Sequence, residues 1–401
     1  MTKPSGVWAT LAGQSRAVEV LSRATQGAEH AMTHAWLITG PPGSGRSIAA
    51  KAFAAALQCP QGGCGQCTEC HTSLAGSHPD VLLVRTERLS IGVDQVRELV
   101  RRAAMTPTKG HWQVLVIEDA DRITDYGANS LLKSIEEPPL RTVWVLCAPS
   151  SEDVIPTIRS RCRELRLVSP TDAVVVDLLV NRDGISPSLA AEVARIAQGH
   201  VGKARGLAND PAEREARQLL LTVPTRLTSV GACLEAAGSI VSQAEMSAKA
   251  EAAALNTRER AETEALYTAA KGGVKSREAQ AALRRLDEEQ KAREKRLQRN
   301  RLDSALTELA TWYRDVLAMQ LDATAPSATS NSATTPPPEQ QPTVNIINLA
   351  LRTGIAQMSA SCKPEHTIRC LDAILQTRIA IESNVSPLLA FETMLLTLGN
   401  Q

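Results

Sequence analysis

The feature that most constrains this chain is a glycine-rich segment of eight residues, Gly40-Pro41-Pro42-Gly43-Ser44-Gly45-Arg46-Ser47. It follows an apolar run at 35–39 and opens a helical pattern, which is the strand–loop–helix context of a phosphate-binding loop (P-loop). Glycines let backbone N–H groups turn towards phosphate oxygens, and the helix N-terminus adds positive potential. We therefore predict that ATP or ADP binds here with Mg²⁺, the alternative being a tight turn that binds nothing. The predicted nucleotide contacts are Gly40, Gly43, Gly45, Arg46 and Ser47, with Ser47 as the Mg²⁺ ligand.

Two departures from the usual motif argue against efficient ATP hydrolysis. Position 46 is Arg where the motif has Lys, and a planar guanidinium is larger than the ammonium that fits between phosphates. After the apolar run 113–117, Glu118 and Asp119 invert the Asp-Glu order that holds Mg²⁺ and activates water. Each carboxylate is displaced by one methylene, and a misplacement near 1 Å can cost about 10²-fold in rate. Both acids also fit a purely structural role at the end of a strand.

Apolar runs alternate with helical patterns through the first 168 residues, which is typical of βαβ units around a parallel sheet. We predict an α/β domain over 1–168, followed by a small helical lid at 169–210 with two helices that end at Gly199 and Gly206. The expected strands are 35–39, 80–84, 113–117, 142–147 and 164–168, and the expected helices include 46–57 and 93–104.

An all-helical domain is predicted over 211–401, because no segment beyond Asp210 resembles a strand. Residues 246–301 are rich in Ala, Glu, Lys and Arg and predict one long exposed helix. A linker composition marks about 323–343, and helices are expected at 344–353, 364–381 and 387–398. The long helix carries a basic cluster, for which a solvated face of mixed charge is favoured over a DNA-contacting patch. Its members are Arg284, Arg285, Lys291, Arg293, Lys295, Arg296, Arg299 and Arg301, interrupted by Asp287, Glu288, Glu289 and Glu294.

Four of the nine cysteines crowd into one short segment, with the spacing Cys-x4-Cys-x2-Cys-x2-Cys. An odd total without a secretory signal argues against a disulfide framework, so metal binding is the leading interpretation. Four thiolates suit a closed, tetrahedral, structural Zn²⁺ site, with free thiols, an iron–sulfur cluster or a haem attachment as alternatives. The predicted ligands are Cys59, Cys64, Cys67 and Cys70, while His71 and His78 are expected at the surface.

Charge and hydropathy exclude other classes of protein. Lys plus Arg number 44 against 43 Asp plus Glu, a net charge of +1, so any nucleic-acid contact has to come from a local patch or from an assembly. Aromatic residues make up 2%, which leaves few stacking platforms and disfavours a zinc-bearing DNA-binding module acting alone. Without a signal segment or a long apolar stretch, a soluble cytoplasmic protein with no membrane contact is expected.

Beyond these motifs, several longer segments resemble the bacterial DNA polymerase III clamp loaders of the AAA+ class, in particular their delta-prime subunits. The resemblance covers about the first 210 residues and is thin beyond them. The segments that carry it include Leu11-Ala12-Gly13-Gln14, the P-loop, the four cysteines, Glu118-Asp119-Ala120-Asp121-Arg122, Leu131-Leu132-Lys133-Ser134-Ile135-Glu136-Glu137-Pro138-Pro139 and Ser160-Arg161-Cys162.

The resemblance implies a role in an assembly. Arg161 would be an arginine finger that acts in trans on a neighbour's ATP, and Gly202 replaces the lid arginine that the family's active ATPases carry, with Lys203 or Arg205 as partial substitutes. Together with Arg46 and the inverted acids, this favours a stator over a motor. The implied partners are gamma/tau and delta subunits in a five-membered ring, with the sliding clamp and primed DNA. The alternative is an active AAA+ ATPase, either a gamma/tau-like motor or a branch-migration motor.

Overall fold

The computed structural model describes residues 5–27, 31–85, 90–268, 277–324 and 346–399. The chain divides into two compact units, Met1–Asp210 and Pro211–Gln401, here called unit 1 and unit 2. Among the described helices, none is both long and apolar enough to cross a membrane.

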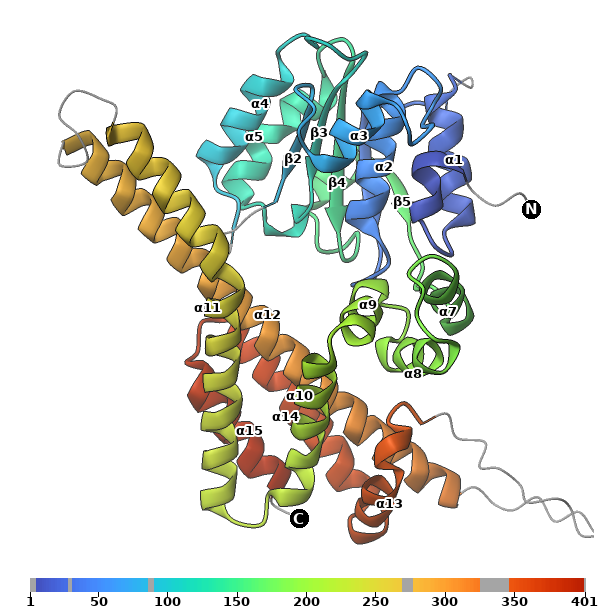
Figure 1. Ribbon diagram of the computed structural model, residues 1–401, viewed down its shortest axis with the longest axis vertical. Helices are drawn as coiled ribbons and strands as arrows, with labels where there is room; N and C mark the ends of the chain where they lie inside the picture. Colours follow the sequence, from blue (N-terminus) through green and yellow to red (C-terminus); the bar gives the residue numbers. More distant parts are fainter. Residues whose placement is uncertain (1–4, 28–30, 86–89, 269–276, 325–345, 400–401) are drawn as a thin grey trace, which may run out of the picture. The chain divides into compact units, whose positions relative to one another are not determined.

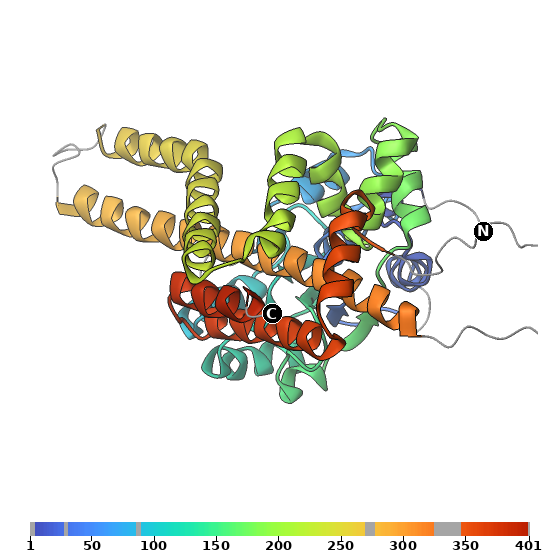
Figure 2. The same ribbon diagram turned by 90° about the horizontal axis from the view of Figure 1, so that it is seen from below.

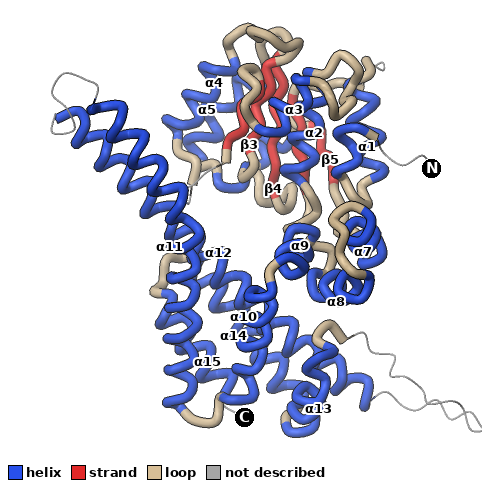
Figure 3. Tube along the Cα trace, viewed as in Figure 1, coloured by secondary structure: helices blue, strands red, loops and turns tan. Residues whose placement is uncertain are grey.

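Unit 1 is built on a five-stranded parallel sheet with the strand order β2-β3-β4-β1-β5 (Figures 1 and 3). This confirms the predicted α/β fold. The last strand is shorter than expected, because its pairing with β1 ends at Arg166 and the chain then turns towards the lid. The strands are β1 (Ala35–Thr39), β2 (Val81–Val84), β3 (Gln113–Ile117), β4 (Thr142–Ala148) and β5 (Arg163–Arg166).

Helices cover both faces of this sheet (Figure 3). Alternate residues of each buried strand face opposite sides, so Trp36 and Val145 join one apolar core while Leu37 and Leu146 join the other. On the first face, Phe53 of α2 meets Trp36 edge to face at 5.3 Å between ring centroids. The helices of this domain are η1 (Gly6–Thr10), α1 (Ser15–Thr25), α2 (Arg46–Gln58), α3 (Thr68–Ala75), α4 (Val93–Ala103), η2 (Ala120–Arg122), α5 (Asp125–Glu136) and α6 (Pro156–Arg159).

The lid contains three helices where the sequence predicted two, namely α7 (Asp172–Asn181), α8 (Pro187–Ala197) and α9 (Val201–Asn209). Gly199 does follow a helix end, in the left-handed conformation that glycine favours. Gly206 does not end a helix but lies inside α9, because a single glycine costs a helix only about 1 kcal/mol. A three-helix core of small and branched side chains holds the lid together.

The described residues of unit 2 form helices and no strand, and the two longest helices are α11 and α12 (Figures 1 and 2). The single helix predicted over 246–301 is wrong, since this stretch is divided between α11 and α12, which pack side by side as a hairpin. The elements are α10 (Pro211–Thr222), η3 (Val223–Arg226), α11 (Val230–Thr268), α12 (Arg277–Thr324), η4 (Leu349–Leu351), α13 (Arg352–Ser361), α14 (Pro364–Glu382) and α15 (Pro387–Gly399).

The predicted linker at 323–343 begins inside α12, and its residues from 325 onwards lie outside the described part. The helix predicted at 344–353 is also wrong, because residues 346–348 are not helical and α13 begins at Arg352. The reason is a buried carboxylate. Asp315 of α12 accepts the backbone N–H of Ile347 at 3.1 Å and that of Asn348 at 2.8 Å. These two N–H groups therefore have hydrogen-bond partners without the segment being helical.

Asp80, at the start of β2, fixes the loop that leads into β3. Its carboxylate accepts hydrogen bonds from the backbone N–H groups of Thr108, Lys109 and Gly110 at 2.6–2.8 Å, and from the Thr108 hydroxyl. Although burial raises the pKa of this carboxyl, the hydrogen bonds outweigh burial and lower the pKa to about 2.

A carboxyl with a lowered folded-state pKa stabilises the fold above its unfolded pKa, and this stability is lost as pH falls through the folded pKa. We expect Asp80 to contribute about 2 kcal/mol near neutral pH, lost between pH 4 and about 2. Urea unfolding of Asp80→Asn, followed by tryptophan fluorescence, should show at least that loss at pH 7 and a narrowing gap to wild type below pH 4. Four of the five tryptophans report on unit 1.

The matched control is Asp94→Asn, because Asp94 is 95% exposed. A stability gap for Asp80→Asn that stays constant from pH 7 to pH 2 would contradict the assigned role of the carboxylate charge.

Candidate functional site

The P-loop connects β1 to α2, with Gly45 at the N-terminal end of the helix. Gly43 and Gly45 have φ of +81° and +94°, conformations that side chains disfavour. Gly43 is also crowded, because a Cβ there would lie 2.2 Å from Cγ of His200 in the lid. The loop therefore adopts the turn that the motif predicts, and His200, in the last third of the lid, lies directly against it.

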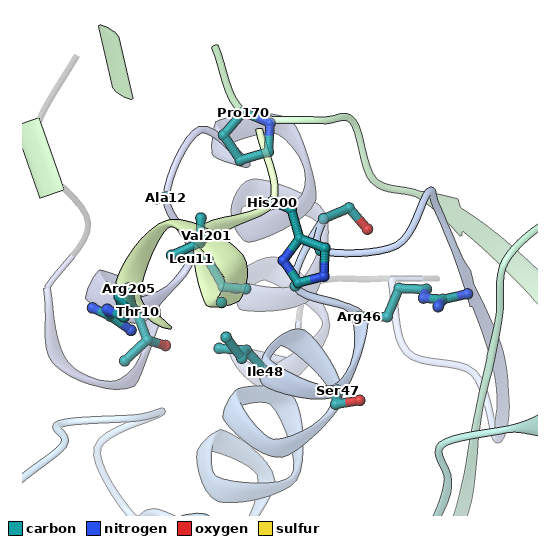
Figure 4. A pocket seen from close by; sticks show the side chains of 14 residues that line it. Thr10, Leu11, Ala12, Arg46, Ser47, Ile48, Pro170, His200, Val201 and Arg205 are labelled. Atoms are coloured by element: carbon teal, nitrogen blue, oxygen red, sulfur yellow. The ribbon is translucent and has the colours of Figure 1, made fainter. Parts of the chain in front are cut away.

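A cavity of about 260 Å³ opens beside this loop (Figure 4). That volume is near the lower end of the usual range for small-molecule sites, about 300–1,000 Å³. Three segments line it: the end of η1, the P-loop, and the lid residues Pro170, His200, Val201, Gly202 and Arg205. Four of the predicted nucleotide residues, Gly43, Gly45, Arg46 and Ser47, thus lie together at one cavity, while Gly40 lies outside its lining.

Arg46 contributes its backbone to the cavity, but its side chain extends away from Val201 and Arg205 (Figure 4). Its charge acts on the β3 and β4 side of the loop, where it partly offsets the raised pKa values of Asp121 and Cys147, both of which are raised mainly by burial. Within the described residues, the buried Nη1 of Arg46 and Oγ of Ser44 have no hydrogen-bond partner. Buried donors without partners are costly, and phosphate oxygens would satisfy them. The loop is therefore compatible with a bound phosphate group.

The two acids after β3 have different surroundings. Glu118 is 11% exposed and pairs with Lys51 of α2, with 3.2 Å between Oε1 and Nζ. Asp119 directly precedes η2 and makes no side-chain cap there. The Glu118 carboxylate is therefore paired with a cation through one of its two oxygens.

The lid residue that lies against the P-loop is His200, whereas from the sequence we considered an arginine at position 202. His200 begins α9, and its Nδ1 accepts the backbone N–H of Lys203 at 3.0 Å. Burial lowers the pKa of His200, which favours the neutral ring that this cap requires. Arg205, one suggested substitute for the missing lid arginine, forms two hydrogen bonds with Asp183 at 2.6 and 3.1 Å. Its guanidinium is thus already engaged within the lid.

Gln14 joins the P-loop to the junction between sheet and lid. Its Nε2 donates to the carbonyl oxygens of Ser44 and Val168 at 3.1 and 2.6 Å, and its Oε1 accepts from the Val168 N–H at 3.2 Å. The side chain is buried, and its hydrogen bonds to Val168 join positions that are 154 residues apart in the sequence. Each donor and acceptor of the amide thus helps to fix the loop relative to the first residues of the lid.

The four clustered cysteines converge, with their sulfur atoms all within 4.8 Å of one another. Sγ of Cys59 and Sγ of Cys67 lie 3.7 Å apart, close to the edge of about 3.8 Å that a tetrahedron of sulfurs with 2.3 Å metal bonds requires. Burial raises the pKa of Cys59, but the N–H groups of Cys64, Gly63 and Gln61 outweigh it and lower that pKa to about 6. This cluster could hold a metal ion.

A neighbouring histidine differs from expectation. His71 is exposed as predicted, but His78 is buried, not at the surface. His78 accepts the N–H of Asp80 through Nδ1 and contacts Oε2 of Glu69 through Nε2 at 2.8 Å. Glu69 lies between Cys67 and Cys70 on α3, so His78 links the cysteine segment to β2.

Arg161 follows α6 and is 37% exposed in its side chain. Its Nη1 donates to the carbonyl oxygen of Thr157 at 2.9 Å, and Nε and Nη2 both contact Oε1 of Glu136 at the end of α5. In the chain by itself the guanidinium is therefore neutralised within unit 1.

Comparison with known proteins bears on these residues. Residues 13–171 match the family model described as DNA polymerase III, delta subunit. The DNA polymerase III subunit delta′ of Pseudomonas aeruginosa is 37% identical over 171 residues, which is 41% of this chain and 52% of the relative. That of Escherichia coli is 35% identical over 180 residues, 43% and 54% of the two chains. The predicted clamp-loader resemblance is confirmed over these residues. The chain spans about half the length of these delta′ relatives.

Two further comparisons concern a gamma/tau subunit and a solved structure. The subunit gamma/tau of Mycobacterium tuberculosis strain H37Rv is 36% identical over 171 residues, 41% of this chain and 29% of the relative. A solved gamma subunit-related protein of Thermotoga maritima covers 95% of this chain and 98% of its own, with 17% identity and a TM-score of 0.44, a likeness too low to argue from. The P-loop, the cysteine cluster and Arg161 all lie within the clamp-loader-like 13–171, whereas the lid and unit 2 lie almost wholly outside it.

Sequence reasoning missed Lys51, His200 and the bridging role of Gln14. Lys51 lies on an alanine-rich helix, where nothing indicates that it meets Glu118. The segment containing Gln14 was noticed only for its resemblance, because hydrogen bonds over 154 residues leave no local pattern.

We expect Gln14→Ala to destabilise unit 1 by about 2 kcal/mol, since it removes three buried hydrogen bonds and leaves two carbonyl oxygens and one N–H with fewer partners. Urea unfolding followed by tryptophan fluorescence measures the change. Gln26→Ala, at an exposed position just after α1, is the control and should be nearly neutral. Equal effects of the two substitutions would show that Gln14 does not fasten the loop.

Proposed function

We propose that the chain is a delta-prime-type stator of a DNA polymerase III clamp loader. It completes the ATP site of a neighbouring gamma/tau-type subunit with Arg161, hydrolyses little or no ATP itself, and helps to load the sliding clamp on primed DNA. The observation that carries this proposal is the partly exposed Arg161 inside the region that matches the delta family. A five-membered ring with delta and gamma/tau subunits is part of the same proposal.

The chain's own P-loop supports a stator over a motor. The Arg46 side chain extends away from the lid, Glu118 is paired with Lys51, and Gly202 offers no side chain where an active ATPase would place an arginine. Hydrolysis needs an acid on Mg²⁺ and a cation on the γ-phosphate, and each of these positions is occupied by something else. Bound ATP or ADP with Mg²⁺ is still part of the proposal, with a structural role, because the loop glycines, Ser44 and Ser47 suit phosphate binding.

Arg161 has the properties that a finger requires. It is always charged, it presents a planar fork to phosphate oxygens, and it lies on the surface within reach of a second chain. The Glu136 carboxylate has to release it first, because a carboxylate beside a γ-phosphate would repel it. Partly exposed ion pairs contribute only about 0–1 kcal/mol, so this exchange costs little.

We expect Arg161→Ala to leave the chain folded but to lower ATP turnover by the assembled loader at least about tenfold, since arginine fingers contribute 10³–10⁵ where they act alone. Arg161→Lys should recover little, because an ammonium lacks the fork. Arg159→Ala, which removes the same charge two residues away, is the matched control. Turnover by the Arg161→Ala assembly equal to that of wild type would sink the finger role.

An active motor subunit is the second candidate, favoured by the similarity to gamma/tau and by the complete glycine spacing of the loop. Turnover by the purified chain alone decides between the two. ATP turnover by the chain alone that Arg46→Ala abolishes would identify a motor. No ATP turnover by the chain alone, together with Arg161-dependent turnover in the assembly, supports the stator.

We also propose that the cysteine cluster binds a structural Zn²⁺. The sulfur spacing fits tetrahedral coordination, and four protein ligands leave no open position for catalysis. The ligands would be Cys59, Cys64, Cys67 and Cys70. The cluster packs against η1, where the Val7 N–H donates to the carbonyl oxygen of Gly63 at 3.0 Å, so a bound metal would stabilise this edge of unit 1.

The purified chain should contain about one zinc ion per molecule, measured by elemental analysis, and chelation should lower its Tm. Cys64→Ser should lose the metal, whereas Cys362→Ser, in unit 2, should keep it. Four-sulfur coordination predicts intense thiolate-to-metal absorption when Co²⁺ replaces Zn²⁺. Stoichiometric iron with sulfide, or no metal in freshly purified protein, would contradict the assignment.

A further inference from the structure

The outer half of the α11/α12 hairpin has no partner in the core of unit 2. The residues of that core reach Ala244 on α11 and resume at Leu302 on α12. The intervening stretches, 246–268 and 277–301, are here called the arm. In Figures 1 and 2 the two stretches run side by side. A long charged arm that stabilises no core needs another explanation.

The seam between the two helices of the arm decides which face of α12 points outward. Small residues allow close approach, with Ala248, Ala252 and Ala279 all buried. Arg293 is 8% exposed in its side chain and pairs with Glu259 of α11 at 2.8 Å. Gln290 donates to the carbonyl oxygen of Asn256 at 2.9 Å. Such a buried polar network fixes the rotation of a helix, because any other rotation leaves charges buried without partners.

Four basic residues lie on the opposite face of α12. Arg277, Arg284 and Lys291 recur every seven residues and Lys295 follows after four, so at 100° per residue they fall within about 40° of one another. The seam residues are about half a turn away. All four side chains belong to exposed residues, and within the described part of the chain none of them makes an ion pair or hydrogen bond. We call Arg277, Arg284, Lys291 and Lys295 the basic stripe.

The rest of the arm shows that this charge is not simply balanced nearby. On α11 the bases are paired along the helix, Lys249 with Glu245, Arg258 with Glu262 and Arg260 with Glu264. Arg260 also pairs with Asp287 of α12 at 3.0 Å. On the stripe face, by contrast, Glu288 is the one acid among the described residues that falls between the four bases. The chain as a whole has a net charge of +1, so the stripe is a local concentration of charge.

The chemistry of the stripe selects among anionic partners. No aromatic or large aliphatic side chain of the arm shares its face, since the other α12 residues of the arm within about 60° of Arg277 are Gln280, Ala281, Glu288, Ala292, Gln298 and Arg299. A membrane-binding helix needs an apolar face, and a protein interface needs apolar or aromatic anchors at its centre. A phosphate backbone needs neither. The stripe is about 27 Å long with charges about 6–10 Å apart, a row of separate cations that suits the repeated negative charges of a DNA backbone.

We propose that the basic stripe binds the phosphate backbone of double-stranded DNA without sequence preference. This inference is independent of the proposed stator role, because it requires neither Arg161 nor a partner subunit. It also revises the sequence-based preference for a merely solvated face, since the four bases share one direction and make no ion pair with any described residue.

The test uses the full-length chain and a fluorescein-labelled DNA duplex of about 20 base pairs, with binding measured by anisotropy at several salt concentrations. The stripe variant is Arg284→Gln/Lys291→Gln/Lys295→Gln. The control, Lys249→Gln/Arg258→Gln/Arg260→Gln, makes the same change of net charge on α11. Circular dichroism verifies that both remain helical, and the double variant Lys291→Gln/Lys295→Gln provides a milder change should the triple variant lose helix.

We expect wild type to bind at low salt, the stripe variant to bind at least about tenfold more weakly, and its log–log salt slope to be smaller by about 2–3. The control should stay within about twofold of wild type. Absence of wild-type binding at low salt, or equal losses in both triple variants, would overturn the proposal. Stripe-dependent binding that is tighter to polyglutamate or to anionic vesicles than to DNA would overturn it too and assign the surface to an acidic protein or a membrane.

Discussion

The hydrogen bonds of Gln14 are the constraint on which the site depends. One amide holds a carbonyl of the P-loop and both backbone groups of Val168, so the loop, the end of the sheet and the start of the lid keep one arrangement. His200 then lies against Gly43 because the lid begins at a fixed place. The cavity beside the loop is a product of this fastening, and so is the separation of the Arg46 side chain from the lid.

Much of the fold could be predicted because its signals are local. The strands β1 to β4 show as apolar runs, and the P-loop and the cysteine spacing are contiguous. The errors have physical causes. The division of 246–301 between α11 and α12 escaped notice because the two helices share one composition. Residues 346–348 avoid the helix because Asp315, more than thirty residues earlier, accepts the N–H groups of Ile347 and Asn348. Pairings such as Lys51 with Glu118 depend on tertiary proximity alone.

Burial and exposure separate the residues that keep the fold from those available to partners. Asp80, Gln14 and His78 are buried and fully engaged, and they tie loops to the sheet. Arg161 and the basic stripe are exposed, and their charges are either loosely paired or unpaired. The chain, whose net charge is only +1, thus carries exposed basic residues at two separate surfaces, one on each unit.

The seam of the arm has a further consequence. Its α12 positions Ala279, Leu286 and Arg293 recur every seven residues, the first and third buried and the second partly buried, and so do Arg277, Arg284 and Lys291 on the outside. Removing or adding two helical turns on both helices would therefore leave the inner and outer faces in phase. A change of arm length in steps of seven residues would therefore leave Asp315 and the core of unit 2 undisturbed, so the length of the arm is not fixed by the packing of the fold.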